Sequence, residues 1–330
     1  EELDILGITS SGRVQVGESL VSLKGMDVVS AKDFTRPLVE KVFEVSDEVL
    51  RSPEKFRDSL AGKRVALLFV EPSTRTYSSF HVAARRMGAD VLPLVDPEMT
   101  SLAKGESLYD TLKMIEGYGV DCIVMRHPAR GAAKYAADVV KVPVINAGSG
   151  SQEHPTQSLL DAYTIVRKRG SVDGLTIGFL GDLRFSRTVP SLVYTLALFE
   201  GVTMYFIAPS ALQIRPEVEL HLRKRGIRYS RVEKQSEIPK AVAELDVLYV
   251  TRLQKERFPD PSEYERLRGS YRVDMEFLSN AKPTLGVMHP LPRVDELDPE
   301  VDATPHAWYF EQASYGLPVR MALYHLILGD

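Results

Sequence analysis

The chain has 330 residues, which exceeds the limit of roughly 250–300 residues for one hydrophobic core, so we expect two domains. Its 41 basic and 45 acidic residues give a net charge of −4, which removes any global electrostatic reason to expect nucleic acid or an anionic membrane as partner. No apolar stretch approaches the roughly 18 residues of a membrane span, and the single cysteine, Cys122, excludes an internal disulfide. We expect a cytoplasmic protein, or one that reaches an organelle after a targeting segment is removed.

The first 22 residues lack a helical period and contain the turn-forming stretch Gly7-Ile8-Thr9-Ser10-Ser11-Gly12. The chain also begins at Glu1 rather than at a methionine. We therefore interpret residues 1–22 as an extension or linker, which suggests a piece of a longer polypeptide.

Short apolar runs then alternate with helix-length amphipathic segments. This alternation is typical of parallel sheets that helices cover on both faces. We predict an α/β chain of two doubly wound domains with mainly parallel sheets flanked by helices, with a long helix over 154–169 passing from one to the other. The predicted strands are 64–70, 120–125, 142–147, 176–180, 203–207, 246–250 and 285–288, and the predicted helices include 187–199 and 238–245.

The first predicted strand leads directly into the motif Glu71-Pro72-Ser73-Thr74-Arg75-Thr76, and a helical pattern follows through Met87. A helix start carries unbonded N–H groups and the positive end of the helix dipole. Ser73, Thr74 and Thr76 add hydroxyl groups, and the guanidinium of Arg75 suits a phosphate or a carboxylate. The alternative is an ordinary capped helix with one surface arginine.

Polar residues follow the other predicted strands as well. Ligands of such sheets bind beyond the carboxyl ends of the strands, so these are the candidate site residues. Several arginines at strand ends indicate a small ligand with more than one anionic group. The segments are Arg126-His127-Pro128, Asn146, His154-Pro155-Thr156-Gln157, Gly181-Asp182, Arg187-Thr188, Thr251-Arg252-Leu253-Gln254 and His289-Pro290-Leu291-Pro292-Arg293.

These segments, in this order, resemble the carbamoyltransferase family, and within it the aspartate carbamoyltransferase catalytic chains. The resemblance runs from about Leu23 to Gly329 and includes Ser101-Leu102-Ala103-Lys104-Gly105-Glu106. It implies an enzyme of de novo pyrimidine biosynthesis that transfers the carbamoyl group of carbamoyl phosphate to the amine of L-aspartate. It also implies a carbamoyl phosphate-binding domain over 23–153 and 309–330, and an aspartate-binding domain over 154–308.

The resemblance assigns a role to each matching residue. It implies that His154 donates to the carbonyl oxygen of the carbamoyl group, and that Gln157 meets its amide. Residues implied to take part in catalysis are Arg75, Thr76, Lys104, Arg126 and His154. Carbamoyl phosphate is implied to bind Ser73, Thr74, Arg75, Thr76, Arg126, His154, Gln157, Pro290, Leu291 and Pro292, and aspartate to bind Lys104, Arg187, Arg252 and Gln254. In the family a cis bond often joins the leucine and the proline matched here by Leu291 and Pro292.

Read locally, Lys104 is a solvated surface lysine. The resemblance instead implies that Ser101 and Lys104 reach into the active site of an adjacent subunit in a homotrimer. A separate regulatory chain or fused domains are compatible with it. We predict small-molecule substrates, no nucleic-acid or membrane partner, no metal and no cofactor.

Two positions depart from the family pattern, with Tyr77 in place of a second arginine and Ser149 in place of aspartate. His127 and His289 are interpreted as structural rather than catalytic. Two alternative functions remain. A carbamoyltransferase for another amine such as ornithine usually has cysteine where Pro290 stands, and a non-catalytic scaffold domain would have lost parts of the phosphate motif.

Overall fold

The structure is a computed structural model that describes residues 22–95, 105–253, 260–267 and 271–329. It divides into two compact units, a first unit of Glu1–Leu160 with Tyr315–Asp330 and a second unit of Asp161–Ser314. The limits between these units fall within helix α5 (Pro155–Arg169) and at the end of helix α10 (Tyr309–Ser314). The domain limits expected from the sequence, after 153 and after 308, lie at the starts of these two helices. The predicted extension over 1–22 lies almost wholly outside the described residues.

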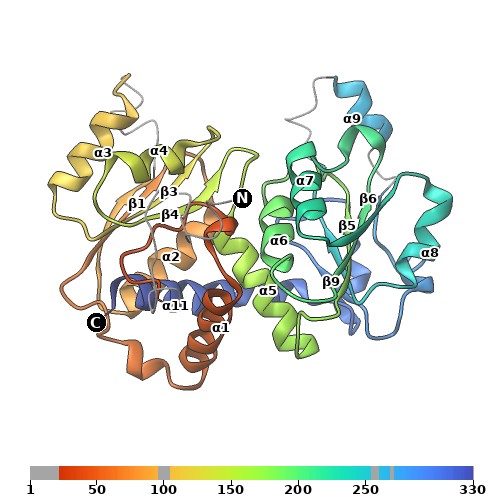
Figure 1. The fold of residues 1–330 in the computed structure, drawn as a ribbon, viewed down its shortest axis with the longest axis horizontal. Coiled ribbons are helices and arrows are strands. Elements are labelled where there is room, and N and C mark those ends of the chain that lie inside the picture. Colours follow the sequence, from red (N-terminus) through yellow and green to blue (C-terminus); the bar gives the residue numbers. More distant parts are fainter. Residues whose placement is uncertain (1–21, 96–104, 254–259, 268–270, 330) are drawn as a thin grey trace. The chain divides into compact units, whose positions relative to one another are not determined.

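In the first unit, the described residues form a four-stranded sheet in the order β2-β1-β3-β4, and every strand pair is parallel (Figure 1). Its strands are β1 (Arg64–Phe69), β2 (Asp90–Leu94), β3 (Cys122–His127) and β4 (Val144–Ser149). The helical segments are η2 (Ala31–Asp33), α1 (Arg36–Arg51), η3 (Pro53–Phe56), α2 (Thr74–Arg86), α3 (Leu108–Gly117), α4 (Ala132–Val139), the first part of α5, and α11 (Gly316–Leu328).

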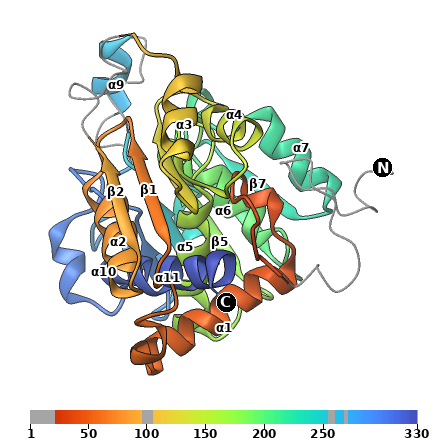
Figure 2. The ribbon, with the colours of Figure 1, turned by 90° about the vertical axis from the view of Figure 1, so that its left-hand side faces the viewer.

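Helices cover both faces of this sheet because the central strands are apolar on both sides. Ala66 and Leu68 of β1 pack with α3 and α4 in one buried cluster, in which alanines such as Ala133 and Ala136 bring α4 close to the sheet. On the other face α2 lies beside α11, and α11 beside α1 (Figure 2). These contacts fix the start of α2 at the carboxyl end of β1.

In the second unit, the described residues form a five-stranded parallel sheet in the order β7-β6-β5-β8-β9. The two-domain parallel α/β fold predicted from the sequence is therefore confirmed. The strands are β5 (Thr176–Leu180), β6 (Thr203–Ile207), β7 (Arg228–Val232), β8 (Val247–Val250) and β9 (Gly286–Met288). The helical segments are α6 (Thr188–Leu196), η5 (Ser210–Leu212), α7 (Pro216–Lys224), η6 (Gln235–Glu237), α8 (Ile238–Val242), α9 (Pro261–Leu267), η8 (Phe277–Asn280), η9 (Pro299–Ala303) and α10.

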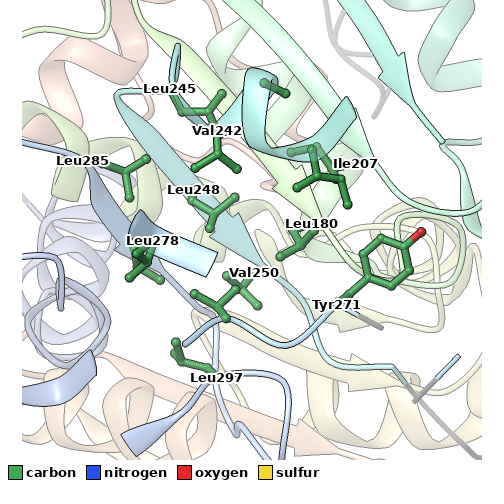
Figure 3. Packing of buried hydrophobic residues seen from close by; sticks show 14 of the residues in the cluster. Leu180, Ile207, Val242, Leu245, Leu248, Val250, Tyr271, Leu278, Leu285 and Leu297 are labelled. Carbon is green, nitrogen blue, oxygen red and sulfur yellow. The ribbon is translucent and has the colours of Figure 1, made fainter. Parts of the chain in front are cut away.

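A buried cluster joins one face of this sheet to α8 and to the segments that follow β8. Leu180 of β5, Ile207 of β6 and Leu248 of β8 point into the same core as Val242 and Leu245 (Figure 3). Leu180 lies opposite Ile207 and Val250 in the strand register, whereas Leu248 lies two residues earlier in β8. Packing of these side chains helps to set the positions of the loops that leave the strands at their carboxyl ends.

The sequence analysis missed β2 and β7, and both are edge strands. An edge strand has one open side, so it tolerates polar residues and even proline. β2 contains Pro93, and in β7 only Val232 is buried. Neither strand therefore carries the continuous apolar run from which the central strands were predicted. None of the described helices has the length and apolar character needed to cross a membrane.

Candidate active site

Helix α2 begins inside the motif that follows β1. Its first three residues are Thr74, Arg75 and Thr76, and Ser73 precedes them in extended conformation. The N–H of Tyr77 donates to the Ser73 carbonyl at 3.3 Å, so the N–H groups of the three residues before it lie in the turn that has no intrahelical acceptors. These N–H groups and the hydroxyl side chains offer several donors to one anion.

Two arginines lie at the carboxyl ends of β1 and β3. The two strands pair in parallel, with Phe69 opposite Arg126. The guanidinium of Arg126 is mostly buried and donates to the carboxylate of Glu71 at 3.0 Å. The Arg75 side chain is exposed, and no ion pair or hydrogen bond holds its guanidinium within the described part of the chain.

His154 lies at the start of α5 and is 4% exposed. Its carbonyl accepts from the N–H of Gln157 at 3.1 Å, which begins the helix. Its Nε2 lies 3.4 Å from the Thr76 hydroxyl oxygen. The structure therefore brings the phosphate motif and the predicted carbonyl donor together within the first unit, and Gln157 lies buried one turn along the same helix.

Buried polar contacts shape the loop that leads from β4 to His154. The amide of Asn146 donates to the Ser149 hydroxyl at 3.1 Å and to the Val29 carbonyl. Glu153 accepts from the hydroxyl of Ser30 at 2.6 Å and from the N–H of Ala31 at 2.7 Å. Ser149, one of the two positions that depart from the resembled pattern, is thus a buried hydrogen-bonding residue in this loop.

Tyr77 also has a local packing role. Its ring meets Phe69 edge to face at 5.5 Å, and its hydroxyl lies 3.2 Å from Nδ1 of His81. His127 has its own structural contact, because its Nδ1 accepts from the N–H of Ala129 at 2.9 Å. Partial burial lowers the pKa of His127, and the nearby Glu71 carboxylate opposes this shift.

In the second unit, the predicted aspartate ligands Arg187 and Arg252 follow the adjacent strands β5 and β8. The N–H of Thr251 donates to the Leu180 carbonyl at 2.9 Å, which holds the two strand ends together. Gly181 permits this approach: it adopts φ +112°, and a Cβ there would lie 2.5 Å from the Thr251 carbonyl oxygen. Both arginines thus leave the same end of the second sheet.

The segment Pro290-Leu291-Pro292 follows β9 and contains a cis bond between Leu291 and Pro292. His289, buried at the start of this segment, holds it. The N–H of Leu291 donates to Nδ1 of His289 at 2.8 Å, so the ring proton lies on Nε2, which donates to Glu296 at 2.6 Å.

This histidine belongs to a longer buried network. Its backbone N–H donates to the Gln312 side chain at 2.9 Å, and Gln312 donates to Asp161 at 2.7 Å. Asp161 also accepts from the hydroxyl of Tyr249, at 2.7 Å. Burial alone would raise the pKa of Glu296, but hydrogen bonds from His289 and from nearby backbone outweigh it, and the pKa lies below the usual 4.5.

Arg293 anchors the other end of the segment. Its guanidinium makes a two-pronged contact with the carboxylate of Asp302, at 2.5 and 2.6 Å. It also lies over the rings of Tyr309 and Phe310, at 5.4 and 5.5 Å from their centres. This hydrogen bonding lowers the pKa of Asp302, so the carboxylate stays ionised.

Three predicted site residues, Ser101, Lys104 and Gln254, lie outside the described residues. Within the described ranges, no three histidine, cysteine, aspartate or glutamate side chains gather in a way that could hold a metal ion. Cys122 is fully buried in β3, and burial raises its thiol pKa, which fits a small core side chain.

Comparison with known proteins decides the family. The carbamoyl-P binding domain of aspartate/ornithine carbamoyltransferase matches residues 26–167, and the Asp/Orn binding domain of the same enzymes matches residues 173–327. The chain belongs to the aspartate/ornithine carbamoyltransferase family.

Relatives in this family cover nearly the whole chain. The aspartate carbamoyltransferase catalytic subunit of Hyperthermus butylicus is 52% identical over 93% of this chain and 97% of its own length, and that of Thermofilum pendens is 51% identical over 92% and 95%. The catalytic subunit of M. jannaschii aspartate transcarbamoylase has a TM-score of 0.81 at 46% identity and covers 91% of this chain and 97% of its own. Aspartate transcarbamoylase from Trypanosoma cruzi, in complex with N-(phosphonacetyl)-L-aspartic acid, has a TM-score of 0.87 at 38% identity, with 94% and 98% covered.

The residues that support this carbamoyltransferase site were not predicted from the sequence. Glu71 opens the phosphate motif, but its partner Arg126 lies 55 residues further along the chain, so the sequence alone does not show this ion pair. Glu296 and Asp302 follow the His289–Arg293 segment within a few residues, yet spacing alone does not show that they turn back onto it. Gln312 and Asp161 carry no local signal, since both are far from His289 in sequence.

We predict that Glu296→Gln lowers the free energy of unfolding by about 1–3 kcal/mol at pH 7, because a buried carboxylate that accepts two hydrogen bonds is replaced by a poorer acceptor. The folded-state pKa of Glu296 is lowered, so its stabilisation is full above the unfolded pKa and is lost as pH falls through the folded one. Urea unfolding at pH 7 and at pH 4 measures both effects.

The control is Glu48→Gln, which removes an exposed carboxylate paired with Lys55 at 3.2 Å and should cost less than about 0.5 kcal/mol. The difference between wild type and Glu296→Gln should shrink at acid pH. A difference that stays constant with pH, or a loss no larger than that of Glu48→Gln, would contradict the proposed role of this carboxylate.

Proposed function

We propose that this chain transfers the carbamoyl group of carbamoyl phosphate to the amine of L-aspartate and releases N-carbamoyl-L-aspartate and phosphate. The observation that carries the proposal is the match over 93% of the chain to relatives named as aspartate carbamoyltransferase catalytic subunits. Solved relatives from Trypanosoma cruzi bind carbamoyl phosphate together with aspartate. The chain is accordingly a transferase, and its product belongs to pyrimidine biosynthesis.

The first unit binds carbamoyl phosphate. The N–H groups of Thr74, Arg75 and Thr76 and the side chain of Ser73 receive the phosphate, because a helix start is positive and rich in donors. The guanidinium of Arg75 adds one cation to this anion, and Arg126, fixed by Glu71, adds a second. This arrangement stabilises the leaving phosphate as charge builds on it.

His154 acts on the carbamoyl carbonyl. Attack of the amine on the carbamoyl carbon develops negative charge on the carbonyl oxygen, and a donor already in place lowers that barrier. The Thr76 hydroxyl, 3.4 Å from Nε2 of His154, shares this role. Gln157 meets the carbamoyl amide, and the carbonyl groups of Pro290, Leu291 and Pro292 receive its N–H bonds.

The second unit supplies the aspartate ligands. Two carboxylates on the substrate require two separate cations, and Arg187 and Arg252 follow adjacent strands of one sheet. Gln254 completes the set from the second unit, and Lys104 of an adjacent subunit joins it. We assign no side chain as general base, because the departing phosphate can itself accept the proton of the attacking amine.

A test of the function measures product colorimetrically with carbamoyl phosphate and either aspartate or ornithine as acceptor. Product from aspartate alone is expected. His154→Ala should lower kcat by about 100- to 1000-fold with a smaller change in the aspartate KM, since one donor to the oxyanion is removed. His81→Ala, in the third turn of α2, is the matched control and should keep wild-type turnover.

Three results would count against this assignment. Equal turnover with ornithine would show that the chain does not select aspartate as its acceptor. Absence of turnover with both amines would favour a scaffold role. A His154→Ala variant that loses thermal stability but keeps kcat would show that His154 only caps its helix.

The active enzyme is a homotrimer in which Ser101 and Lys104 complete the site of the adjacent subunit. The resemblance to aspartate carbamoyltransferases supports this assembly, and the relatives' designation as catalytic subunits is compatible with a regulatory chain. The cytoplasmic location stays a prediction that rests on the sequence.

We predict that Lys104→Ala and Arg75→Ala trimers are each nearly inactive, while trimers reassembled from a mixture of the two regain activity. In a closed ring, random mixing places an intact phosphate motif of one chain next to an intact lysine of another in some sites. The measurement is turnover before and after joint unfolding and refolding, with each parent refolded alone as the control. Activity no higher than that of the parents, or a monomeric mass for the fully active enzyme, would refute the shared site.

A further inference from the structure

Arg320 is a buried cation in the first unit that none of the roles above uses. It lies on α11, whose other residues are mostly apolar, and only 3% of its surface is exposed. Burial of a guanidinium is costly unless hydrogen bonds satisfy its donors. Its contacts therefore indicate what this arginine holds in place.

The guanidinium of Arg320 joins two helices of the candidate site. Its Nη1 donates to the hydroxyl of Ser79 on α2 at 2.9 Å, and its Nη2 donates to the hydroxyl of Thr156 on α5 at 3.3 Å. Its Cζ lies 4.8 Å from the centre of the Phe80 ring, which adds a cation–π contact to α2. One planar group on α11 thus binds both α2 and α5.

Each contact is one step from a residue that faces carbamoyl phosphate. The Ser79 hydroxyl donates to the carbonyl of Thr76 at 2.9 Å, within the first turn of α2. Thr156 lies in the first turn of α5, two residues after His154. The Thr76 hydroxyl and Nε2 of His154 are themselves 3.4 Å apart. Arg320 therefore connects the first parts of α2 and α5, the two helices from which the side chains of Thr76 and His154 approach each other.

The start of α11 leaves room for this guanidinium. A Cβ on Gly316, at the first position of α11, would lie 2.7 Å from Nη1 of Arg320. Any larger residue there would push the guanidinium away from Ser79. Gly316 and Arg320 lie one turn apart on the same helix, and the small size of Gly316 allows the Arg320 guanidinium to lie where it contacts Ser79.

We propose that Arg320 is a positioning residue for the carbamoyl phosphate site: its two-pronged guanidinium holds the first turns of α2 and α5 in register, so that Thr76 and His154 are in place before the ligand binds. The proposal rests on the function given above for Thr76 and His154. The geometry requires a fork, because two hydroxyl groups on different helices are bound by two different nitrogens. A lysine ammonium keeps the charge but lacks the rigid fork.

The test is Arg320→Lys in the full-length enzyme, with kcat and both KM values measured and the circular dichroism spectrum recorded. We expect kcat to fall and the KM for carbamoyl phosphate to rise, together by about 10- to 100-fold in kcat/KM, because small displacements of positioned groups have effects of this size. The aspartate KM should change less than about threefold, since the second unit is untouched. The inhibition constant of inorganic phosphate should weaken in parallel.

Tyr324→Phe is the matched control. Tyr324 is also fully buried on α11, and its hydroxyl donates to the Phe80 carbonyl at 3.4 Å, so its loss disturbs the same packing without touching the hydroxyl groups of Ser79 and Thr156. It should lower the thermal midpoint and leave all kinetic constants near wild type. Ser79→Ala and Thr156→Val keep Arg320 and remove one contact each; they serve if Arg320→Lys does not fold, and both should change the constants in the same direction but less.

Wild-type kinetics in Arg320→Lys, or kinetic losses equal to those of Tyr324→Phe, would overturn the proposal, as would unchanged constants in both Ser79→Ala and Thr156→Val. These failures are distinct from failure of the proposed function. An inactive His154→Ala enzyme beside a fully active Arg320→Lys enzyme would remove only the positioning role, whereas a fully active His154→Ala enzyme would remove the function assigned to the site.

Discussion

The parallel pairing of β1, β3 and β4 is the constraint on which the chemistry of the first unit depends. Parallel strands end at the same edge of a sheet, so the motif after β1, Arg126 at the end of β3 and His154 after β4 emerge on one side. All three connections lead into helices, α2, α4 and α5, and the starts of α2 and α5 lie next to the candidate site residues. In the proposed function, the backbone N–H groups at the start of α2 receive the phosphate and the neighbouring side chains add further donors and cations.

Buried and partly buried polar contacts then hold this backbone arrangement in place. Glu71 fixes Arg126, Glu153 ties the loop before His154 to the 30–31 segment, and His289 and Arg293 hold the two ends of the segment with the cis bond. Each supporting group is hydrogen-bonded because an unsatisfied buried polar group costs free energy. Residues outside the proposed substrate-binding set thus hold its members in place, and the proposed role of Arg320 extends this pattern to α11.

The sequence predicted the central strands well because buried parallel strands are continuous apolar runs, as in 64–69 and 203–207. It missed β2 and β7, where an open edge permits proline and charged residues, and it placed the turn of the phosphate motif through Thr76 although α2 already begins at Thr74. The resemblance implied which residues bind the substrates. The residues that support the site could not be predicted from the sequence, because contacts such as that of His289 with Gln312 join positions that only the tertiary fold brings together. Arg320 did leave a signal, because one arginine in an apolar helix needs a partner.

The central claim is that the first turns of α2 and α5 together form the carbamoyl phosphate site. Hydrogen–deuterium exchange of the full-length enzyme, read by mass spectrometry with and without saturating carbamoyl phosphate and in the absence of aspartate, tests it most directly. The account predicts that slowed exchange concentrates in peptides that cover residues 73–77 and 154–158, because the ligand occupies the unbonded N–H groups at the start of α2 and, through the side chains of His154 and Gln157, slows opening of the first turn of α5. Protection of only one of these turns, or protection confined to other parts of the chain, would contradict it.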